Sequence, residues 1–351
     1  MRLIAAVAAS TALIAVPAAR ADSFVDVSFA SAQDGWALVA TRCPPGGDEC
    51  TAVERTSDGG RTWSRLASLP ASAQLAHINR EAGVTFGTVA FVATDGGRRW
   101  QRVRHLRFES VTAAAGATFA LTYSNTGCPA ECNVALRRAT NGSSVFTGIP
   151  AFRSPSLGFG DTLVGAGANL YAMGFGHVSG GAERAYSRIA ISRDGGRLWS
   201  VRGDPCRERG PQEVDSTQVV AEGGYVAFLC VVRATGAGSI ALSRDAGRTF
   251  SRLHPPVAGG YADQIALDGA GHFAILETVD GATSHSADRL TLSYDGGRTW
   301  RVALRRRSTE TTAPPPPSLT IFGRSLRWLV SGRTLLRSDD AGRTWQSTSA
   351  P

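Results

Sequence analysis

Apolar and polar residues alternate in short runs along almost the whole chain, and each run ends in a turn rich in Gly, Asp, Ser or Asn. Runs of this length and period are typical of half-buried β-strands. The first unit predicts strands at 24–29, 36–41, 51–56 and 63–66. The last unit predicts strands at 318–322, 326–331, 333–338 and 345–347. The pattern therefore predicts an all-β chain of four-stranded antiparallel units, whose strands we call A to D in chain order.

A turn motif close to Ser/Thr-x-Asp-Gly-Gly-Arg-Thr-Trp follows strand C of each unit. Six copies are nearly complete and a seventh, at 140–146, is degenerate. The Asp or Asn of the motif stands at Asp58, Asp95, Asn141, Asp194, Asp245, Asp295 and Asp340. The intervals run from 37 to 53 residues with a mean of 47, which fits a four-stranded propeller blade. We therefore expect a single seven-bladed β-propeller with this motif in every C-to-D turn.

One domain is expected to occupy residues 22–351, after a signal peptide at 1–21. The expected blades are 24–69, 74–105, 108–149, 160–203, 215–253, 261–305 and 317–348. Because the first strand is an A strand and the last is a D strand, we expect the ring to close without a strand borrowed from the opposite terminus.

The turn motif has a local explanation that requires no metal or cofactor. Its Asp can accept hydrogen bonds from backbone N–H groups a few residues on, and the following Gly supplies a positive φ. The Ser or Thr hydroxyl can bind the turn's own backbone, and the Trp or Phe covers the hairpin with an apolar ring. We therefore interpret the motifs as structural, and we expect no cofactor.

The repeated motif resembles the Asp box, or BNR repeat, of the sialidase-like propeller superfamily, and the resemblance covers essentially the whole chain after residue 21. The segment from Phe29 to Leu38 also resembles the blade openings of photosystem II assembly-factor-like propellers, a style shared with exported bacterial propellers. The resemblance implies the fold. It leaves the activity open, because related repeats occur in sialidases, endoglucanases, sorting receptors and non-catalytic assembly factors.

The N-terminal segment has the composition of a secretory signal. Arg2 precedes an apolar stretch from Leu3 to Val16, and Ala19-Arg20-Ala21 forms an A-x-A cleavage site. The stretch is too short for a spanning helix. We expect cleavage after Ala21 and a secreted, periplasmic or extracellular protein; an uncleaved N-terminal anchor is the alternative.

Antiparallel strands alternate in direction, so the A-to-B and C-to-D turns should share one face of the disc and the B-to-C and D-to-A loops the other. The long insertions all belong to the second group. The six cysteines also lie in or beside these loops, an even number that suits an oxidising compartment. We predict disulfides Cys43 to Cys50, Cys128 to Cys132 and Cys206 to Cys230, and no metal site.

Loops on a rigid scaffold commonly carry function. We therefore predict that a partner binds this insertion-rich face, and that the chain is a monomer. The candidate residues are Asp48, Glu49, Glu131, His177, Glu183, Arg184, Tyr186, Arg207, Arg209, Tyr261, Asp263, His285, Asp288 and Arg306. The wider set adds Glu208, His254 and Asp280.

The chain has a net charge of +8, and every basic residue except histidine is Arg. Codon usage of a GC-rich genome explains the absence of Lys, whereas the planar fork of Arg suits carboxylate or phosphate partners. Two clusters stand out, Arg98, Arg99, Arg102, Arg104 and Arg107 around one D strand and Arg305, Arg306 and Arg307 after another. Charge on an outer strand also prevents edge pairing. No stacking motif accompanies the charge, so nucleic acid is not an expected partner.

The enzyme alternative is a sialidase-like glycosidase. Such enzymes use three arginines on the substrate carboxylate, a Tyr activated by a Glu, and an Asp acid/base, and their first arginine lies in a Phe/Tyr-Arg-Ile-Pro motif ahead of the first repeat. No such motif precedes Ser57, and Phe152-Arg153-Ser154-Pro155 falls in mid-chain. We therefore expect a non-catalytic propeller that binds a protein or glycan, with glycosidase activity as the alternative.

Overall fold

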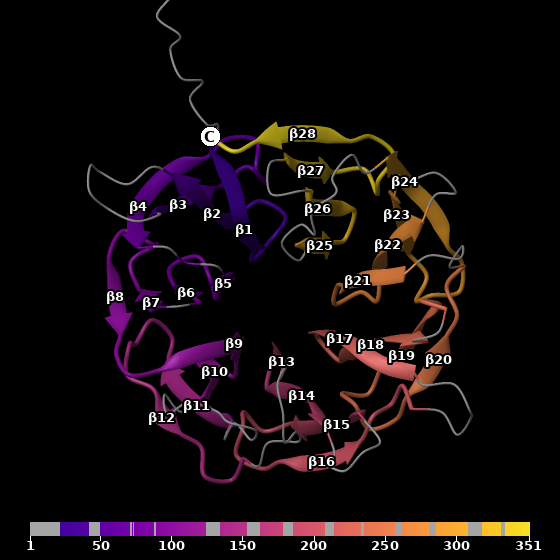
Figure 1. The fold of residues 1–351 in the computed structure, drawn as a ribbon, viewed down its shortest axis with the longest axis horizontal. Coiled ribbons are helices and arrows are strands. Elements are labelled where there is room, and N and C mark those ends of the chain that lie inside the picture. The colour runs from indigo at the N-terminus through magenta and orange to yellow at the C-terminus, as the bar shows by residue number, and fades with distance from the viewer. Residues whose placement is uncertain are drawn as a thin grey trace, which may run out of the picture.

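The computed structural model describes most of the chain outside the N-terminal segment and the longest loops. The described residues are 22–41, 50–70, 72, 74–87, 89–123, 134–152, 162–177, 185–207, 214–232, 235–256, 261–280, 286–307, 318–330 and 334–351. They form seven antiparallel sheets of four strands each, set around a ring (Figure 1). The predicted seven-bladed β-propeller is confirmed. No helix in the described ranges is long and apolar enough to cross a membrane.

The first four blades follow one another in chain order. Blade 1 contains β1 (Ser23–Phe29), β2 (Gly35–Thr41), β3 (Cys50–Thr56) and β4 (Ser64–Pro70). Blade 2 contains β5 (Gln74–His77), β6 (Gly83–Phe86), β7 (Ala90–Ala93) and β8 (Trp100–Val103). Blade 3 contains β9 (Arg107–Ala114), β10 (Ala117–Tyr123), β11 (Val134–Thr140) and β12 (Thr147–Gly148). Blade 4 contains β13 (Thr162–Ala166), β14 (Asn169–His177), β15 (Ala185–Ser192) and β16 (Ser200–Gly203).

The last three blades complete the ring. Blade 5 contains β17 (Val214–Glu222), β18 (Tyr225–Val232), β19 (Gly238–Ser243) and β20 (Ser251–Leu253). Blade 6 contains β21 (Tyr261–Leu267), β22 (Phe273–Asp280), β23 (Ser286–Ser293) and β24 (Arg301–Arg307). Blade 7 contains β25 (Leu319–Phe322), β26 (Ser325–Val330), β27 (Thr334–Ser338) and β28 (Gln346–Ser349). Each sheet uses four consecutive strands, so the ring closes without a borrowed strand, as predicted.

Several strands run further than the sequence predicts. His177 ends β14 and Tyr186 lies in β15, while Asp288 lies in β23. These residues were expected in loops. Arg306 was expected after the D strand of blade 6, but it pairs with Asp288 across β23 and β24. These hairpins extend because their polar residues continue the ladder at the end of the sheet, where alternating apolar character no longer marks a strand.

The core is divided among the interfaces between blades. Strand A lies innermost and strand D outermost in every blade (Figure 1). Each pair of neighbouring blades buries its own apolar cluster; at the closing interface, Val27 and Phe29 of blade 1 pack with Leu329 and Leu335 of blade 7. Since both faces of a sheet are covered by neighbours, the apolar positions of strands B and C are almost completely buried.

Polar side chains also join neighbouring A strands around the inner ring. A carboxylate oxygen of Asp26 accepts a hydrogen bond from the backbone N–H of Leu75 in the next blade at 2.8 Å. Ser110 accepts one from the N–H of Leu163 at 3.0 Å in the same way. These bonds satisfy backbone donors that have no strand partner, since A strands of different blades are not paired in one sheet.

The C-to-D turns, which we call the Asp turns, have the hydrogen bonds that the motif predicts. In blade 1, Asp58 accepts from the backbone N–H groups of Arg61 and Thr62 at 2.9 and 3.0 Å, and from the Thr62 hydroxyl at 2.7 Å. Desolvation opposes ionisation, but the bonds from Thr62 and Thr56 outweigh it and lower the pKa of Asp58 to about 2. The carboxylate is therefore charged in the folded turn at neutral pH.

Six of the seven Asp turns have a second Gly, and this Gly has a further role that local turn chemistry does not predict. Gly60 has a φ of 87°, and a Cβ there would lie 2.5 Å from Leu335 Cδ2 in blade 7. The same position in blade 2, Gly97, faces Leu66 of blade 1 at 2.6 Å. The motif thus allows close packing between blades as well as closing its own hairpin.

Candidate functional site

The two faces of the disc are separated as the strand directions predict. Gly59 of an Asp turn donates its N–H to Gln33 O in the A-to-B turn of the same blade at 2.9 Å. The corresponding bond joins Gly195 to Ala168 O at 2.9 Å in blade 4. The A-to-B turns and Asp turns therefore share one face. We call the opposite face, which carries the B-to-C and D-to-A connections, the loop face.

Arginines near the Asp turns link one blade to the next. The Arg193 guanidinium donates to Ala246 O at 2.9 Å, and Arg244 donates to Gly296 O at 2.9 Å. Arg202 donates to Gly247 O at 3.1 Å. A planar guanidinium can reach several carbonyl groups at once, which a single ammonium group does less well. These arginines therefore have a structural role that the sequence alone did not reveal.

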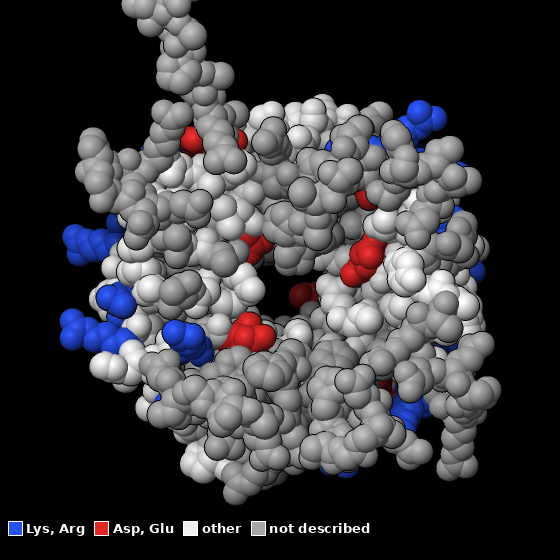
Figure 2. Space-filling model, in the orientation of Figure 1, with Lys and Arg blue, Asp and Glu red and all other residues white. Residues whose placement is uncertain are grey.

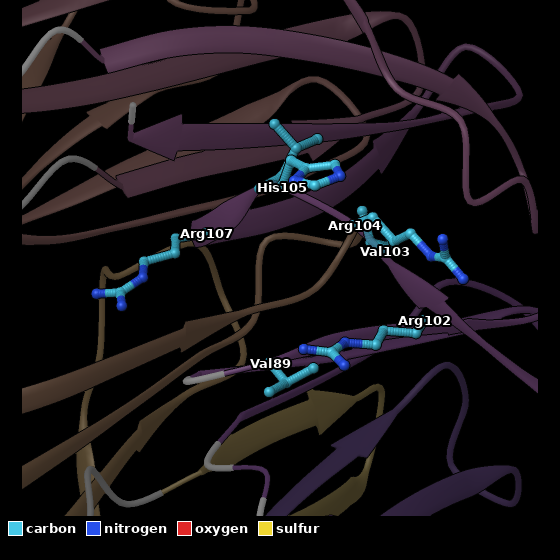
Figure 3. Close-up of a pocket in the computed structure, with 7 residues that line it drawn as sticks. Val89, Arg102, Val103, Arg104, His105 and Arg107 are labelled. Carbon is cyan, nitrogen blue, oxygen red and sulfur yellow. The ribbon is translucent and has the colours of Figure 1, made fainter. Parts of the chain in front are cut away.

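Another group of arginines lines an open cavity of about 670 Å³ on the loop face. The chain leaves β8 at Val103 and enters β9 at Arg107, and the short connection between them forms one wall (Figure 3). We call this cavity the arginine pocket. It is lined by Val89, Arg102, Val103, Arg104, His105, Leu106 and Arg107.

The connection that forms the arginine pocket has an unusual backbone. His105 has a φ of 62°, a left-handed conformation that is uncommon for residues other than Gly. This turn leaves Arg104 and His105 exposed while Val103 is buried. The chain therefore presents three arginine side chains over a partly apolar base.

The pocket is strongly electropositive. No Asp or Glu lines it, and within the described ranges Arg102, Arg104 and Arg107 form no ion pair. Some arginines elsewhere on this face are paired, as Arg289 is with Glu277 at 2.5 Å. The interpretation that these arginines protect a sheet edge fits Arg102 in β8, but Arg104 lies beyond that strand and Arg107 begins an innermost strand.

Charge is also distributed unevenly around the ring. Figure 2 shows a central opening with acidic side chains beside it and basic side chains at the outer edge over β8. Innermost strands supply acidic residues, including Glu109 in β9 and Asp263 in β21. A negatively charged partner would therefore be attracted to the periphery at blades 2 and 3 rather than to the centre.

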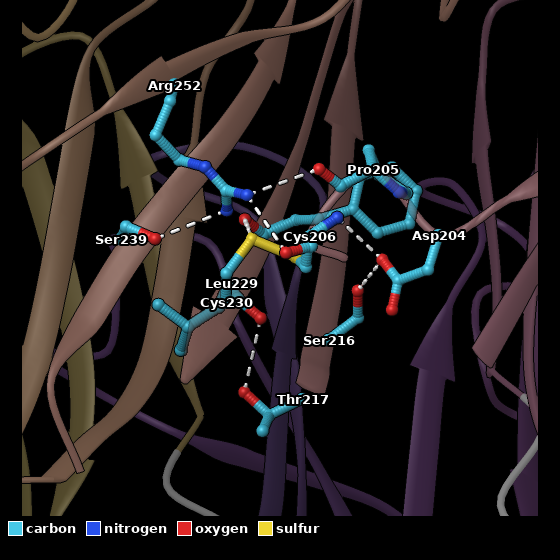
Figure 4. Close-up of a disulfide and its surroundings, with 10 residues drawn as sticks. Asp204, Pro205, Cys206, Ser216, Thr217, Leu229, Cys230, Ser239 and Arg252 are labelled. Atoms are coloured by element: carbon cyan, nitrogen blue, oxygen red, sulfur yellow. Dashed lines mark hydrogen bonds between the residues drawn. A yellow bond between two sulfur atoms is a disulfide. The ribbon is translucent and has the colours of Figure 1, made fainter. Parts of the chain in front are cut away.

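On the other side of the ring, a disulfide fixes the connection from blade 4 to blade 5. Cys206 and Cys230 are bonded, as predicted, with a Cα–Cα distance of 5.3 Å. Arg252 donates to Cys206 O at 2.9 Å, and Asp204 accepts from the Cys206 N–H at 2.7 Å (Figure 4). The connection that presents the exposed Arg207 is thus held by covalent and polar contacts.

The other predicted disulfides fall largely outside the described residues. Cys50, the first residue of β3, is disulfide-bonded, and its predicted partner Cys43 is not among the described residues. Cys128 and Cys132 also lie outside the described residues. Those two pairings stay predictions.

The structure describes only part of the predicted partner-binding set. Outside it lie Asp48, Glu49, Glu131, Glu183, Arg184, Glu208, Arg209 and His285, together with the side chains of His177, Tyr186 and Asp280. Of the rest, Tyr261 is 50% exposed, which is unusual for a large ring in this protein. Asp263 accepts a hydrogen bond from Thr278, and Asp288 forms an ion pair with Arg306 at 3.3 Å. Asp288 and Arg306 are therefore paired with each other on neighbouring strands of blade 6.

The sequence did not predict the arginine pocket, although it identified three of its arginines as part of a basic cluster. The run from Arg102 to Arg107 could have indicated the pocket, because it has three arginines at and just after the end of a predicted strand. Neither the left-handed turn at His105 nor the contribution of Val89 from another loop can be read from that run. The pocket lining holds no Tyr, Asp or Glu to complete a sialidase-like arrangement, and the described residues contain no group of three metal-ligand side chains.

No family model matches the chain, and no curated protein matches it, so membership of the Asp-box repeat family stays a prediction. Solved structures with the same fold do match. A structure of YCF48 bound to D1 peptide has a TM-score of 0.53 at 16% identity, covering 90% of this chain and 92% of that one. YCF48 from Cyanidioschyzon merolae has a TM-score of 0.50 at 16% identity, with 90% and 95% covered.

Enzyme-associated propellers are also similar. The β-propeller domain of the Trilobed protease from Pyrococcus furiosus has a TM-score of 0.55 at 8% identity, with 93% of this chain and 95% of that chain covered. A prolyl endopeptidase structure has a TM-score of 0.57 at 11% identity, and the match covers 93% of this chain but 50% of that one. At these identities the comparisons establish the fold alone.

Proposed function

We propose that this chain is an exported, non-catalytic propeller that binds a protein partner through its loop face. The observation that carries the proposal is the arginine pocket, an open and charged surface that lacks a carboxylate or Tyr to act as acid, base or nucleophile. The similarity in fold to YCF48, which has been solved with a peptide, is consistent with protein binding. Export is supported by the apolar N-terminal stretch and by the Cys206–Cys230 disulfide.

Site-specific photo-crosslinking in the native host tests the proposal. A photoreactive residue would replace exposed loop-face residues, Arg207 and Tyr261, and, as controls, exposed Asp-turn residues, Arg298 and Arg343. We expect the same protein to be captured from both loop-face positions and from neither control position. Equal capture from both faces, or turnover of a fluorogenic sialoside or glycan that is lost on mutating a loop-face carboxylate, would overturn it.

Export has its own test. N-terminal sequencing of the protein recovered from outside the cytoplasm should begin at Asp22. Recovery of the full-length chain in the cytoplasmic fraction alone would contradict this part of the proposal.

A further inference from the structure

We propose that the arginine pocket binds the acidic side chains of an extended peptide segment of the partner. The inference rests on the proposed function and specifies the chemistry of one site on the loop face. The arginines that link blades differ from those that line the pocket. Arg193 and Arg244 donate to carbonyl groups of the next blade, whereas Arg102, Arg104 and Arg107 have no hydrogen-bond acceptor or ion-pair partner within the described ranges.

Carboxylates suit these arginines because charge-assisted, bidentate bonds to guanidinium groups are among the stronger polar contacts that proteins make. Figure 3 shows the guanidinium groups of Arg102, Arg104 and Arg107 well separated rather than directed at one point. A single small anion cannot contact all three groups. A chain with several carboxylates along its length can.

The base of the pocket favours a peptide over other polyanions. Val89 and Leu106 are half-buried and place aliphatic surface between the charged groups, whereas Val103 is 4% exposed and belongs to the core. An extended peptide directs successive side chains to opposite sides, so acidic residues can face the arginines while apolar neighbours contact this surface. The lining contains no Phe, Tyr or Trp on which a nucleobase could stack.

The cavity is large enough for such a segment. A volume of about 670 Å³ accommodates several residues, and the cavity is open to solvent, so a chain can enter and leave it without threading. Because the arginines are exposed, the attraction should weaken as salt is added, over the range where the Debye length falls to about 10 Å or less.

Fluorescence polarisation with a labelled peptide of alternating Glu and Leu tests the inference on the purified chain. The test variant is the triple substitution Arg102→Gln, Arg104→Gln and Arg107→Gln. The matched control removes the same charge from the Asp-turn face, by Arg197→Gln, Arg298→Gln and Arg343→Gln, where the side chains are also exposed. Thermal unfolding of all three proteins checks that they remain folded.

We expect wild type and the control to bind the peptide with similar dissociation constants. The dissociation constant of the pocket variant should be higher by a factor of about ten or more. A peptide of alternating Gln and Leu should not compete. Equal binding by the pocket variant and the control would overturn the inference. So would displacement of the peptide by inorganic phosphate or an oligonucleotide more readily than by unlabelled peptide, since the site would then be a general anion site.

The two proposals fail separately. If crosslinking from Arg207 and Tyr261 still captures a protein while the acidic peptide does not distinguish the variants, the loop face is a partner surface and the pocket inference is wrong. If the peptide distinguishes them but neither face captures a protein in the host, the pocket chemistry holds and the proposed function is wrong.

Discussion

Asp26 in β1 and Ser318 before β25 are 292 residues apart in the sequence, and the Ser318 hydroxyl donates to a carboxylate oxygen of Asp26 at 2.8 Å. The same carboxyl group accepts from the N–H of Leu75 in blade 2. One buried side chain therefore connects blades 7, 1 and 2 at the point where the ring closes. Burial raises the pKa of Asp26 to about 6, although its hydrogen bonds act in the opposite direction.

The raised pKa predicts a pH-dependent stability. The folded state holds the Asp26 proton more tightly than the unfolded state, so stability is lost as the pH rises from about 4 to about 6. A shift of this size corresponds to about 3 kcal/mol. Chemical denaturation measures the unfolding free energies of wild type and Asp26→Asn. The difference between the two should change by about 3 kcal/mol between about pH 4 and about pH 6.

The Asp turns provide an internal reference for that experiment. The Thr299 hydroxyl and backbone N–H lower the pKa of Asp295 to about 2, so the turn loses stability only as the pH falls from about 4 towards 2. The two effects occupy separate pH windows and have opposite signs. A constant difference between wild type and Asp26→Asn from about pH 4 to pH 7 would show that folding does not raise the pKa of Asp26.

Arg327 provides a second prediction at the closing interface. Its side chain is fully buried and donates to Ala32 O of blade 1 at 2.7 Å and to Asp339 at 2.9 Å. Replacement by Met keeps much of the apolar stem, leaves Ala32 O without its donor and removes one of the two arginines that bind Asp339, so we expect a loss of about 3 kcal/mol. Urea unfolding measures it. The control Arg244→Met removes one exposed bond to Gly296 and should cost less than about 1 kcal/mol.

Local patterns predicted the strands and turns because their causes are local. The degenerate turn at Asn141 was placed correctly from its spacing, and Asn141 Oδ1 accepts a hydrogen bond from the Thr118 hydroxyl at 3.0 Å. Arg327 shows the limit. It stands in the apolar run of β26, where its charge suggests exposure, and its burial depends on its bonds to Ala32 O in the neighbouring blade and to Asp339.

The candidate site depends on the same kind of distant contact. The run from Arg102 to Arg107 identifies a basic segment, but Val89 belongs to another connection and completes the pocket only after blade 2 has folded. Sequence reasoning placed function on the loop face from the positions of its insertions. It could not identify which exposed charges lack partners, because pairing such as Asp288 with Arg306 depends on strand register.

Two alanines occupy a backbone conformation that favours Gly, which gives a third prediction. Ala246 and Ala341 replace the first Gly of their Asp turns and have φ values of 55° and 65°. A left-handed conformation costs a residue with a Cβ about 1 kcal/mol or more, partly offset by the greater freedom of Gly in the unfolded chain. Ala246→Gly and Ala341→Gly should each raise the free energy of unfolding by up to about 1 kcal/mol.

The matched control for this prediction is Ala270→Gly, in an A-to-B turn where the backbone φ is not positive. There the substitution adds freedom to the unfolded chain without relieving strain, so it should lower stability by about 0.5 kcal/mol or more. Opposite signs at 246 and 270 in thermal unfolding would support the strain argument, and equal signs would contradict it.

The Cys206–Cys230 disulfide allows a fourth prediction, which concerns how the loop face is held. The bond spans 24 residues, and a loop of this size predicts about 3 kcal/mol of stabilisation through the unfolded state. The double variant Cys206→Ala and Cys230→Ala should therefore unfold at a lower denaturant concentration than wild type. Arg252→Met removes the bonds to Pro205 O and Cys206 O and should have a smaller effect on global stability. Hydrogen exchange at 204–207 separates the two: if exchange accelerates more in Arg252→Met than in the double variant, polar contacts rather than the disulfide hold this connection.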